Sequence, residues 1–337
     1  MAQSRIDDQE QAERVDRINR FRKFLANAGP LVALVVLALF FSIASPTFST
    51  PANLSILLTQ LSIVLVIGIG LTFVILLGSI DLSVEGVLAS SSLVFVLLAT
   101  NDRNDFQFGF LAVVAGVLTG SLFGLINGVL HVRLGIPSFM VTLGMGAVGI
   151  GVATVLFGGR APRLLDDGLR AWGIGSTAGI SNLVFIAAAT LAIAVAVQRF
   201  TRLGRYGYVI GGDEVTAKLS GINIGKYKIL SFVISGTATG IAGVMAAMQL
   251  GVGDATIGVG LLFPAITAVV LGGTLLVGGR GGVVHTLIGV GIMTIIANGL
   301  ILTGVEPYIQ QTVQGLVIVV AVVAGSWSLR KRVRVIK

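Results

Sequence analysis

The chain has 337 residues, of which 55% are hydrophobic and 11% charged, and its formal net charge is +8. A soluble domain carries about 25% charged residues, so this composition excludes an ordinary water-soluble protein and predicts an integral membrane protein. The chain has no cysteine, which excludes disulfides and thiolate metal sites.

Ten apolar segments follow a charged N-terminal segment at residues 1–28. We interpret each as a membrane-spanning helix, because a span needs roughly 20 apolar residues. The segments do not alternate between apolar and polar residues, which argues against a transmembrane barrel. The third and eighth are short and could be tilted or broken. The predicted spans are 29–46, 54–77, 86–100, 109–130, 137–157, 183–199, 229–250, 263–278, 283–303 and 309–327.

The predicted fold is an all-α integral membrane protein with about ten transmembrane helices over residues 29–329, followed by a basic tail at 330–337. Lysine and arginine are enriched in cytoplasmic loops, so their distribution predicts the orientation. With a cytoplasmic N-terminus, nineteen of the 23 basic residues lie inside, and both termini are cytoplasmic. This bias and anionic membrane lipid explain the positive charge, so no nucleic-acid partner is expected. The four outside are Arg103, Arg160, Arg163 and Arg170.

The stretch GSIDLSVEG at 78–86 introduces polar side chains at the start of the third span. Polar groups at membrane depth are costly and are therefore candidates for function. Asp81 could simply cap the helix that follows. Alternatively, the stretch is a break between half-helices that line a cavity, as in transporters. The candidate pathway residues here are Ser79, Asp81, Ser83 and Glu85.

Further polar side chains in the spans could line the same pathway. Their neutral character favours an uncharged polyhydroxy solute, although each alone could instead hydrogen-bond to a neighbouring helix. The stretch GVGDATIGVG lies five spans after Asp81, and two units of five spans would form an inverted repeat. These candidates are Asn127, Ser138, Thr142, Gln249, Asp254, Asn298, Gln310 and Gln311.

The longest predicted cytoplasmic connection, about residues 200–228, contains the signals of a short helix. The glycine pair at 211–212 would break the preceding segment, and Asp213 can cap a helix by accepting bonds from the exposed amides. Gly221 fits the position after the helix, where a left-handed conformation costs glycine nothing. We therefore predict a two-turn helix at 214–220.

The side chains of this helix suggest two different uses. Glu214 suits the positive end of the helix dipole and is spaced to pair with Lys218. Val215, Leu219 and Ile222 would form an apolar side. That side could pack against the ends of the protein's own spans, or it could dock into a groove on a cytoplasmic partner.

A glycine-rich stretch at 272–282 could suggest a phosphate-binding loop, but it lacks the Lys-Ser/Thr ending of that motif. Close helix packing or a tight reversal is the preferred interpretation. His131 and His285 are far apart in the sequence and are expected to be solvated loop residues. The sequence therefore predicts no enzyme, and any ATP hydrolysis must take place on another chain.

Four stretches stand out together: GSIDLSVEG at 78–86, GIPSFMVTLG at 135–144, LGRYGYVIGGDEVTAKLSGINIGKYKI at 203–229 and AVVLGGTLLVGGRGGVVHTLIGVGI at 268–292. In order and spacing they resemble the membrane-spanning subunit of carbohydrate-uptake ABC importers of the ribose-permease type, a family that also includes branched-chain amino-acid permeases. Two positions depart from the usual pattern. Glu85 stands where glycine is usual, and Asp213 stands where asparagine is usual.

The resemblance implies a permease in the cytoplasmic (inner) membrane of a bacterium that imports a small neutral sugar, either a monosaccharide or a polyol. It implies a pair of ATPase subunits that hold ATP and Mg²⁺, an extracytoplasmic solute-binding protein on outer loops such as 158–182, and a second permease subunit, identical or related. No cofactor is expected on this chain itself. The resemblance places the ATPase contact on Gly211, Gly212, Asp213, Glu214, Val215, Lys218, Leu219, Ser220 and Gly221.

Other functions stay open on the sequence. A secondary transporter driven by ions or protons would need an acidic group at mid-depth, for which Asp81, Glu85 and Asp254 are the candidates. A membrane scaffold without transport activity and an ABC exporter are further alternatives.

Overall fold

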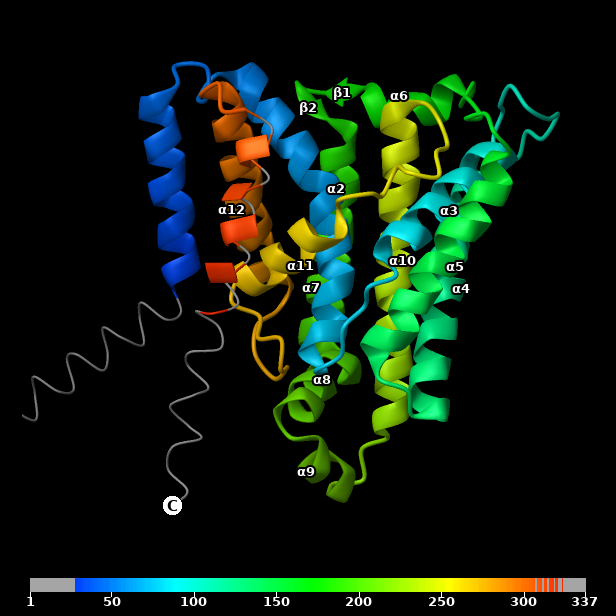
Figure 1. Ribbon diagram of the computed structural model, residues 1–337, viewed down its shortest axis with the longest axis vertical. Coiled ribbons are helices and arrows are strands. Elements are labelled where there is room, and N and C mark those ends of the chain that lie inside the picture. Colours follow the sequence, from blue (N-terminus) through cyan, green and yellow to red (C-terminus); the bar gives the residue numbers. More distant parts are fainter. Residues whose placement is uncertain are drawn as a thin grey trace, which may run out of the picture.

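The structure is a computed structural model that describes residues 28–306, 308–310, 312–313, 315–317, 319–320 and 323. Nearly all of the predicted N-terminal segment, the tail at 330–337 and parts of the predicted tenth span lie outside these residues. The described residues form a helical bundle with one very small sheet (Figure 1). The prediction of an all-helical membrane protein is confirmed.

Long apolar helices dominate the bundle. Three shorter apolar helices accompany them, Ala28–Ala44, α3 (Val84–Leu98) and α11 (Leu262–Leu271). Described residues between 308 and 323 are helical as well. The described residues include six helices long and apolar enough to cross a membrane: α2 (Pro51–Leu76), α4 (Phe110–Leu134), α5 (Ser138–Phe157), α7 (Asn182–Phe200), α10 (Ile224–Leu250) and α12 (Val283–Leu302).

The predicted eighth span, 263–278, is wrong in its second half. Helix α11 ends at Leu271, and residues 272–282 form an irregular loop. Ten residues of helix rise only about 15 Å, roughly half the thickness of the hydrocarbon core. Five glycines of the loop have φ between +75° and +150°, which other residues rarely adopt. The preferred interpretation of this stretch as a tight reversal is confirmed.

Two long helices are each followed by an irregular return and a short helix. Helix α2 runs toward the end where α9 (Glu214–Leu219) lies, and the chain turns back through residues 77–83 before α3 begins inside the bundle (Figure 1). Helix α10 runs toward the opposite end, and the chain returns through residues 251–261 before α11 begins, again inside the bundle. The unit of α2, segment 77–83 and α3 is therefore opposite in direction to the unit of α10, segment 251–261 and α11.

The end opposite α9 carries the predicted outer connection 158–182. It contains the short helix α6 (Asp167–Ile174) and a hairpin of β1 (Ser176–Thr177) and β2 (Ile180–Ser181), which pair antiparallel. The side chain of Asp166 accepts a hydrogen bond from Leu169 N and caps α6. These elements and α9 therefore lie at the two ends of the bundle (Figure 1).

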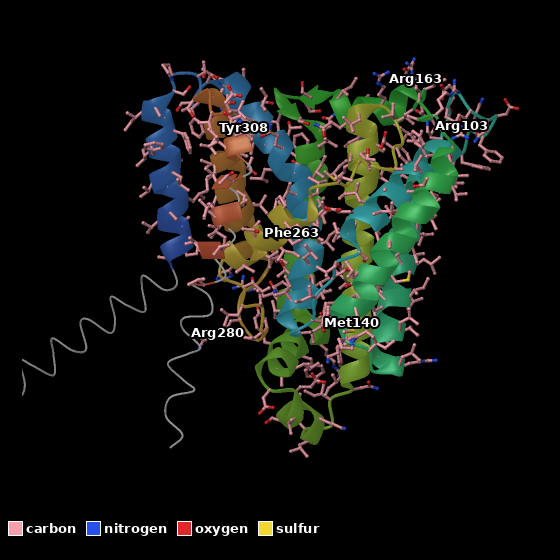
Figure 2. All side chains as sticks on the ribbon, viewed as in Figure 1. Arg103, Met140, Arg163, Phe263, Arg280 and Tyr308 are labelled. Atoms are coloured by element: carbon pink, nitrogen blue, oxygen red, sulfur yellow. The ribbon has the colours of Figure 1, made fainter. Side chains whose placement is uncertain are left out.

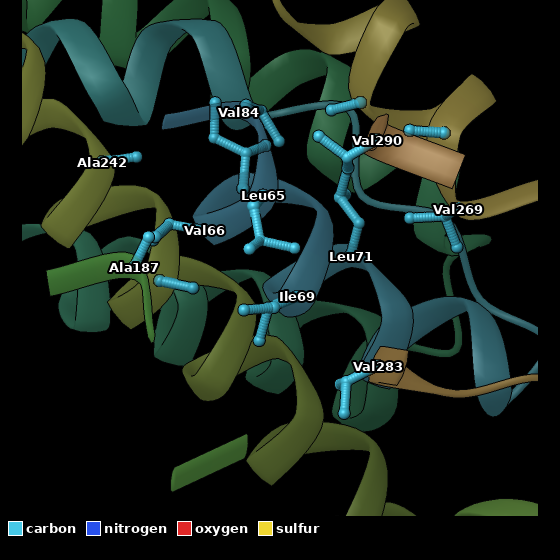
Figure 3. Close-up of a cluster of buried hydrophobic side chains, with 14 of the residues drawn as sticks. Leu65, Val66, Ile69, Leu71, Val84, Ala187, Ala242, Val269, Val283 and Val290 are labelled. Carbon is cyan, nitrogen blue, oxygen red and sulfur yellow. The ribbon is translucent and has the colours of Figure 1, made fainter. Parts of the chain in front are cut away.

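Helix α2 is the centre of the main core. Its side chains Leu65, Ile69 and Leu71 are at most 2% exposed (Figure 3). Lipid is as apolar as these side chains, so close van der Waals packing rather than burial from water holds the helices together. The residues that share this core come from five neighbouring helices and include Val84, Ala187, Ala242, Val269, Val283 and Val290.

Glycines bring helices α4 and α10 into backbone contact. A Cβ on Gly120 would overlap the carbonyl oxygen of Gly236, and a Cβ on Gly236 would overlap the carbonyl oxygen of Gly120. Small residues at such positions allow the close approach on which membrane helices depend. The high glycine content of the chain is used here for packing.

Replacing Gly120 with alanine is therefore expected to destabilise the protein by about 1–3 kcal/mol, because the added methyl group forces two backbones apart. Thermal unfolding of the purified protein in detergent measures this change. Gly144→Ala on α5 is the matched control, since a Cβ there has no neighbour within 4 Å. Equal unfolding temperatures for the two variants would contradict the packing described.

Candidate functional site

Helix α9 forms where the sequence predicts it, and both of its caps are present. Asp213 Oδ1 accepts hydrogen bonds from Val215 N at 2.9 Å and Thr216 N at 3.1 Å. Gly221 has φ of +76°, and Ile222 N donates to Ala217 O at 3.2 Å, which closes a Schellman motif. The predicted helix 214–220, its Asp213 cap and its Gly221 cap are confirmed.

Asp213 stays charged at the start of α9. The hydroxyl of Thr216 donates to its Oδ2 at 2.6 Å. This bond, followed by the amides of Thr216 and Val215, lowers the pKa of the Asp213 carboxyl. Aspartate therefore caps α9 effectively, as the similar capping strengths of aspartate and asparagine predict.

The predicted ion pair between Glu214 and Lys218 is wrong. Glu214 instead pairs with Lys228 of α10, whose Nζ lies 2.9 Å from Glu214 Oε2 and 3.0 Å from Oε1. Helix α10 begins at Ile224 and brings Lys228 beside α9, where its side chain is 15% exposed. Lys228, which the neighbouring helix α10 holds in place, is therefore the ion-pair partner of Glu214, and Lys218, expected from its spacing along the chain, is not.

The apolar residues of α9 divide between two directions. Ala217 is fully buried against Leu77 and Ile210, and the partly buried Ile222 joins the same cluster. Val215 and Leu219 are 69% and 85% exposed. Packing on the protein's own span ends thus accounts for Ala217 and Ile222 and leaves the other two uncovered in this chain.

A helix that the sequence analysis missed precedes α9. Helix α8 spans Arg202–Gly212 and directly follows α7. It ends at the glycine pair expected to break this segment. Leu203, Tyr206 and Ile210 lie at helical spacing and pack inward, so an amphipathic pattern was present in the polar stretch.

A pocket of about 540 Å³ separates α9 from the turn between α4 and α5. His131, Ile136, Lys218 and Lys228 are among its lining residues. His131 is not the solvated loop residue expected. It lies half-buried in the last turn of α4, with Nδ1 2.7 Å from Ile136 O and its ring edge-on to Phe232. His285 is exposed, as predicted, but it lies in the first turn of α12 and not in a loop.

The irregular segment 77–83 is held in place by side chains of α5. Ile80 N donates to Ser138 Oγ at 3.0 Å, and Leu82 N donates to Thr142 Oγ1 at 2.9 Å. Irregular backbone at membrane depth is stable only where its polar groups are satisfied. Ser138 and Thr142 therefore replace the hydrogen bonds that a continuous helix would have made.

Asp81 is the centre of a buried polar network. Its Oδ1 accepts from Ser83 N at 3.0 Å and from Ser83 Oγ at 2.6 Å, and its Oδ2 accepts from Ser235 Oγ of α10 at 2.7 Å. Asn127 Nδ2 of α4 donates to Ser83 Oγ at 2.8 Å. Ser83 occupies the N-cap position of α3, so the prediction that Asp81 itself could cap this helix is wrong. Asp81 is 2% exposed.

Ser235 was missed by the sequence analysis, although it binds the central carboxylate. The run of Ser, Gly and Thr in SGTATG at 235–240 was the signal that could have found it. Ser79 is also buried at the start of segment 77–83, and its amide donates to Val74 O at 3.2 Å. The structure thus brings Ser79, Asp81, Ser83, Asn127, Ser138 and Thr142 into one region.

The second irregular segment, 251–261, contacts Glu85 in the first turn of α3, directly after the first segment. Glu85 Oε1 accepts a hydrogen bond from Gly260 N at 3.0 Å, and Gly258 packs against the Glu85 backbone. Asp254, in the second segment, accepts from Thr256 N and Thr256 Oγ1, both at 2.6 Å. Glu85 and Asp254 are partly exposed, unlike Asp81.

The remaining predicted pathway residues lie elsewhere. Asn298 of α12 and Asn53 of α2 exchange two hydrogen bonds of 3.0 Å, which joins these helices. Gln249 is half-buried in the last turn of α10, and Gln310 donates to Val305 O at 2.7 Å. Gln311 lies outside the described residues. Within the described ranges, no group of three His, Asp or Glu side chains could hold a metal ion.

Comparison with known proteins identifies the family. The family described as "Branched-chain amino acid transport system / permease component" matches residues 53–322. Ribose import permease protein RbsC of Escherichia coli strain K12 is 36% identical, over 90% of this chain and 95% of that protein. L-arabinose ABC transporter permease protein AraH of Azospirillum brasilense is 32% identical, over 92% and 90%.

The D-allose transport system permease protein AlsC of Escherichia coli strain K12 is 32% identical, over 86% of this chain and 88% of that protein. A solved structure, PsaBC from Streptococcus pneumoniae in complex with Fab, is 17% identical over 83% of this chain and 92% of that chain, with a TM-score of 0.45. A likeness at that level supports no conclusion about function. The family match shows a transport component of an ABC importer rather than an enzyme. The chain belongs to the branched-chain amino-acid permease family and, within it, to the multi-pass membrane permeases of bacterial carbohydrate ABC importers.

Proposed function

We propose that this chain is one of two permease subunits, identical or related, that import a small neutral sugar, and that α9 is its contact with the ATPase. The exposed apolar side of α9 carries the proposal. A two-turn helix is marginal in isolation, yet this one is capped at both ends and anchored through Ala217. Val215 and Leu219 then face outward, as expected of anchors for a groove on a partner.

The membrane topology supports this use of α9. Ten crossings result if the short helices α3 and α11 are completed by the irregular segments that adjoin them and the helical residues between 308 and 323 form the last crossing. The segment 1–28 and the tail 330–337 are then both cytoplasmic. Arg103 and Arg163 lie at the end that carries α6, and Arg280 lies toward the other end (Figure 2). The distribution of basic residues supports a cytoplasmic position of α9.

The opposite directions of the two irregular returns support an inverted repeat of five helices. In each half, a long helix is followed by an irregular segment and a short helix that begins inside the bundle. Asp81 lies in the first irregular segment and Asp254 in the second. Broken helices of paired repeats form the solute pathway in many transporters. We therefore assign the contact between the second segment and Glu85, at the start of α3, to the pathway.

The solute class follows from chemistry and from the relatives. Three relatives are named for ribose, L-arabinose and D-allose, which are uncharged polyhydroxy compounds. The side chains near the two segments are mostly neutral donors and acceptors. Both oxygens of Asp81 already accept hydrogen bonds from the protein, so its carboxylate serves the segment and not the solute. An extracytoplasmic binding protein would dock on α6 and the hairpin, and the partner ATPases would hold ATP and Mg²⁺.

A cross-linking experiment tests the placement of α9. The chain lacks cysteine, so Leu219→Cys gives a single reactive site on α9. With a cysteine-directed photo-cross-linker, this site is expected to link to the ATPase in the assembled importer. Ile174→Cys on α6 is the matched control, since Ile174 is 63% exposed at the opposite end. Labelling of position 219 by an impermeant reagent from outside, or no link to the ATPase, would contradict the proposal.

A further inference from the structure

The backbones of three parts of the chain are in direct contact near α9: the end of α2, helix α8 and the loop 272–282. A Cβ on Gly211 of α8 would overlap the carbonyl oxygen of Leu76 and lie 2.5 Å from Gly279 N. Gly279 N donates to the same Leu76 oxygen at 3.0 Å. A Cβ on Gly278 would lie 2.8 Å from both Gly78 N and Leu76 O. We call Leu76, Gly211, Gly278 and Gly279 the glycine junction.

A contact of this kind transmits displacement more directly than a contact between side chains. Side chains can change rotamer and so absorb a small movement of the helix that carries them. Backbone atoms in van der Waals contact have no such freedom, and packed interiors transmit strain. A shift of α8 toward α2 must therefore move the end of α2 or the loop 272–282.

The junction is connected to α9 on one side. Gly211 lies two residues before Asp213, the cap of α9. Ala217 of α9 packs against Leu77, the residue that follows α2, and against Ile210 of α8. A force on the exposed side of α9 therefore acts on α8 and on the start of segment 77–83 together.

On the other side, the junction leads to both irregular regions of the bundle. From Leu76 the chain passes directly into segment 77–83, which contains Asp81. The loop 272–282 is tied to α8 a second time, because Tyr208 donates its hydroxyl hydrogen to Gly281 O at 2.7 Å. Gln198 Oε1 accepts from Val283 N at 3.1 Å, which fastens the start of α12 to α7.

We propose that the glycine junction converts movement of α9 into movement of segment 77–83 and of loop 272–282, which makes Gly211 a positioning residue for transport. The inference rests on the proposed docking of the ATPase on α9. It goes further, because it assigns the transmission of movement from α9 into the bundle to one backbone contact, the glycine junction. The absence of a side chain at Gly211 is the property that makes this contact possible.

The test is Gly211→Ala in proteoliposomes that contain the ATPase and the solute-binding protein. The added methyl group is expected to lower the amount of solute imported per ATP hydrolysed by about fivefold or more, a loss typical of weakened coupling. The ATPase should still co-purify, and Leu219→Cys should still cross-link to it. A merely structural role for Gly211 would lower uptake and hydrolysis together and leave their ratio unchanged.

Gly207→Ala is the matched control on the same helix. A Cβ there would meet only the Cδ2 atom of Leu76, at 3.7 Å, so the ratio of solute to ATP should stay as in the unmodified protein. If Gly211→Ala does not fold, Tyr208→Phe takes its place in the test, because it removes the hydrogen bond to Gly281 O and adds no atoms. It too should lower the ratio of solute imported to ATP hydrolysed.

An unchanged ratio of solute to ATP in whichever of these variants folds would overturn the inference. Loss of ATPase binding in Gly211→Ala would overturn it as well. Failure of Leu219→Cys to cross-link to the ATPase when Gly211 is intact would instead reject the docking of the ATPase on α9.

Discussion

Leu219→Asp is expected to reduce ATP-dependent uptake by at least about tenfold, because a central anchor of an interface contributes about 2 kcal/mol or more to binding. Leu219 is 85% exposed, so the substitution removes almost no contact within this chain. A carboxylate that enters an apolar groove on the ATPase would lose its hydration without gaining a partner. Uptake of labelled sugar into proteoliposomes, with the amount of assembled permease determined in parallel, measures the effect.

Leu219→Met is the control at the same position, since it keeps an apolar side chain of similar size. It should retain most of the uptake, and the unfolding temperatures of both variants should match that of the unmodified protein. Full activity of Leu219→Asp would show that α9 does not receive the ATPase through this residue. A lower unfolding temperature of the aspartate variant would show that Leu219 packs within the permease.

The position and the two caps of α9 could be predicted because they depend on neighbours in the sequence. The bonds from Val215 N and Thr216 N to Asp213 span two and three residues, and the cap at Gly221 requires only a positive φ. Such signals are independent of how the helices pack. The same local reasoning offered a break at 78–86 as one of two interpretations, because polar residues interrupt an apolar run there.

The features that were missed depend on packing between distant parts of the chain. Asp81 binds Ser235, 154 residues away, and a single serine in an apolar helix gives little indication of its partner. Glu214 pairs with Lys228 because α10 lies beside α9, which spacing along one helix could not show. Hydropathy extended the eighth span past Leu271, because it cannot register the positive φ angles of glycines in an otherwise apolar stretch.

Asp81→Ala is expected to cause one of the largest losses of stability in this chain, about 2–4 kcal/mol, because buried donors lose their acceptor. Ser83 N, Ser83 Oγ and Ser235 Oγ all donate to this carboxylate. Thermal unfolding in detergent measures the loss. Asp105→Ala, which removes a carboxylate from an exposed loop position, is the matched control and should be nearly neutral. Equal stability of the two variants would contradict the network.

Asp81→Asn separates this anchoring role from a direct role in the pathway. The amide oxygen can still accept from Ser83, and the amide group can donate to the Ser235 hydroxyl, so the variant should keep most of the stability and most of the uptake. If the negative charge of Asp81 instead took part in translocation, the asparagine variant would fold normally and fail to transport. The carboxylate is buried and both of its oxygens are occupied by protein donors, so the structure favours the first result. Uptake by the asparagine variant therefore decides whether translocation needs the negative charge of Asp81.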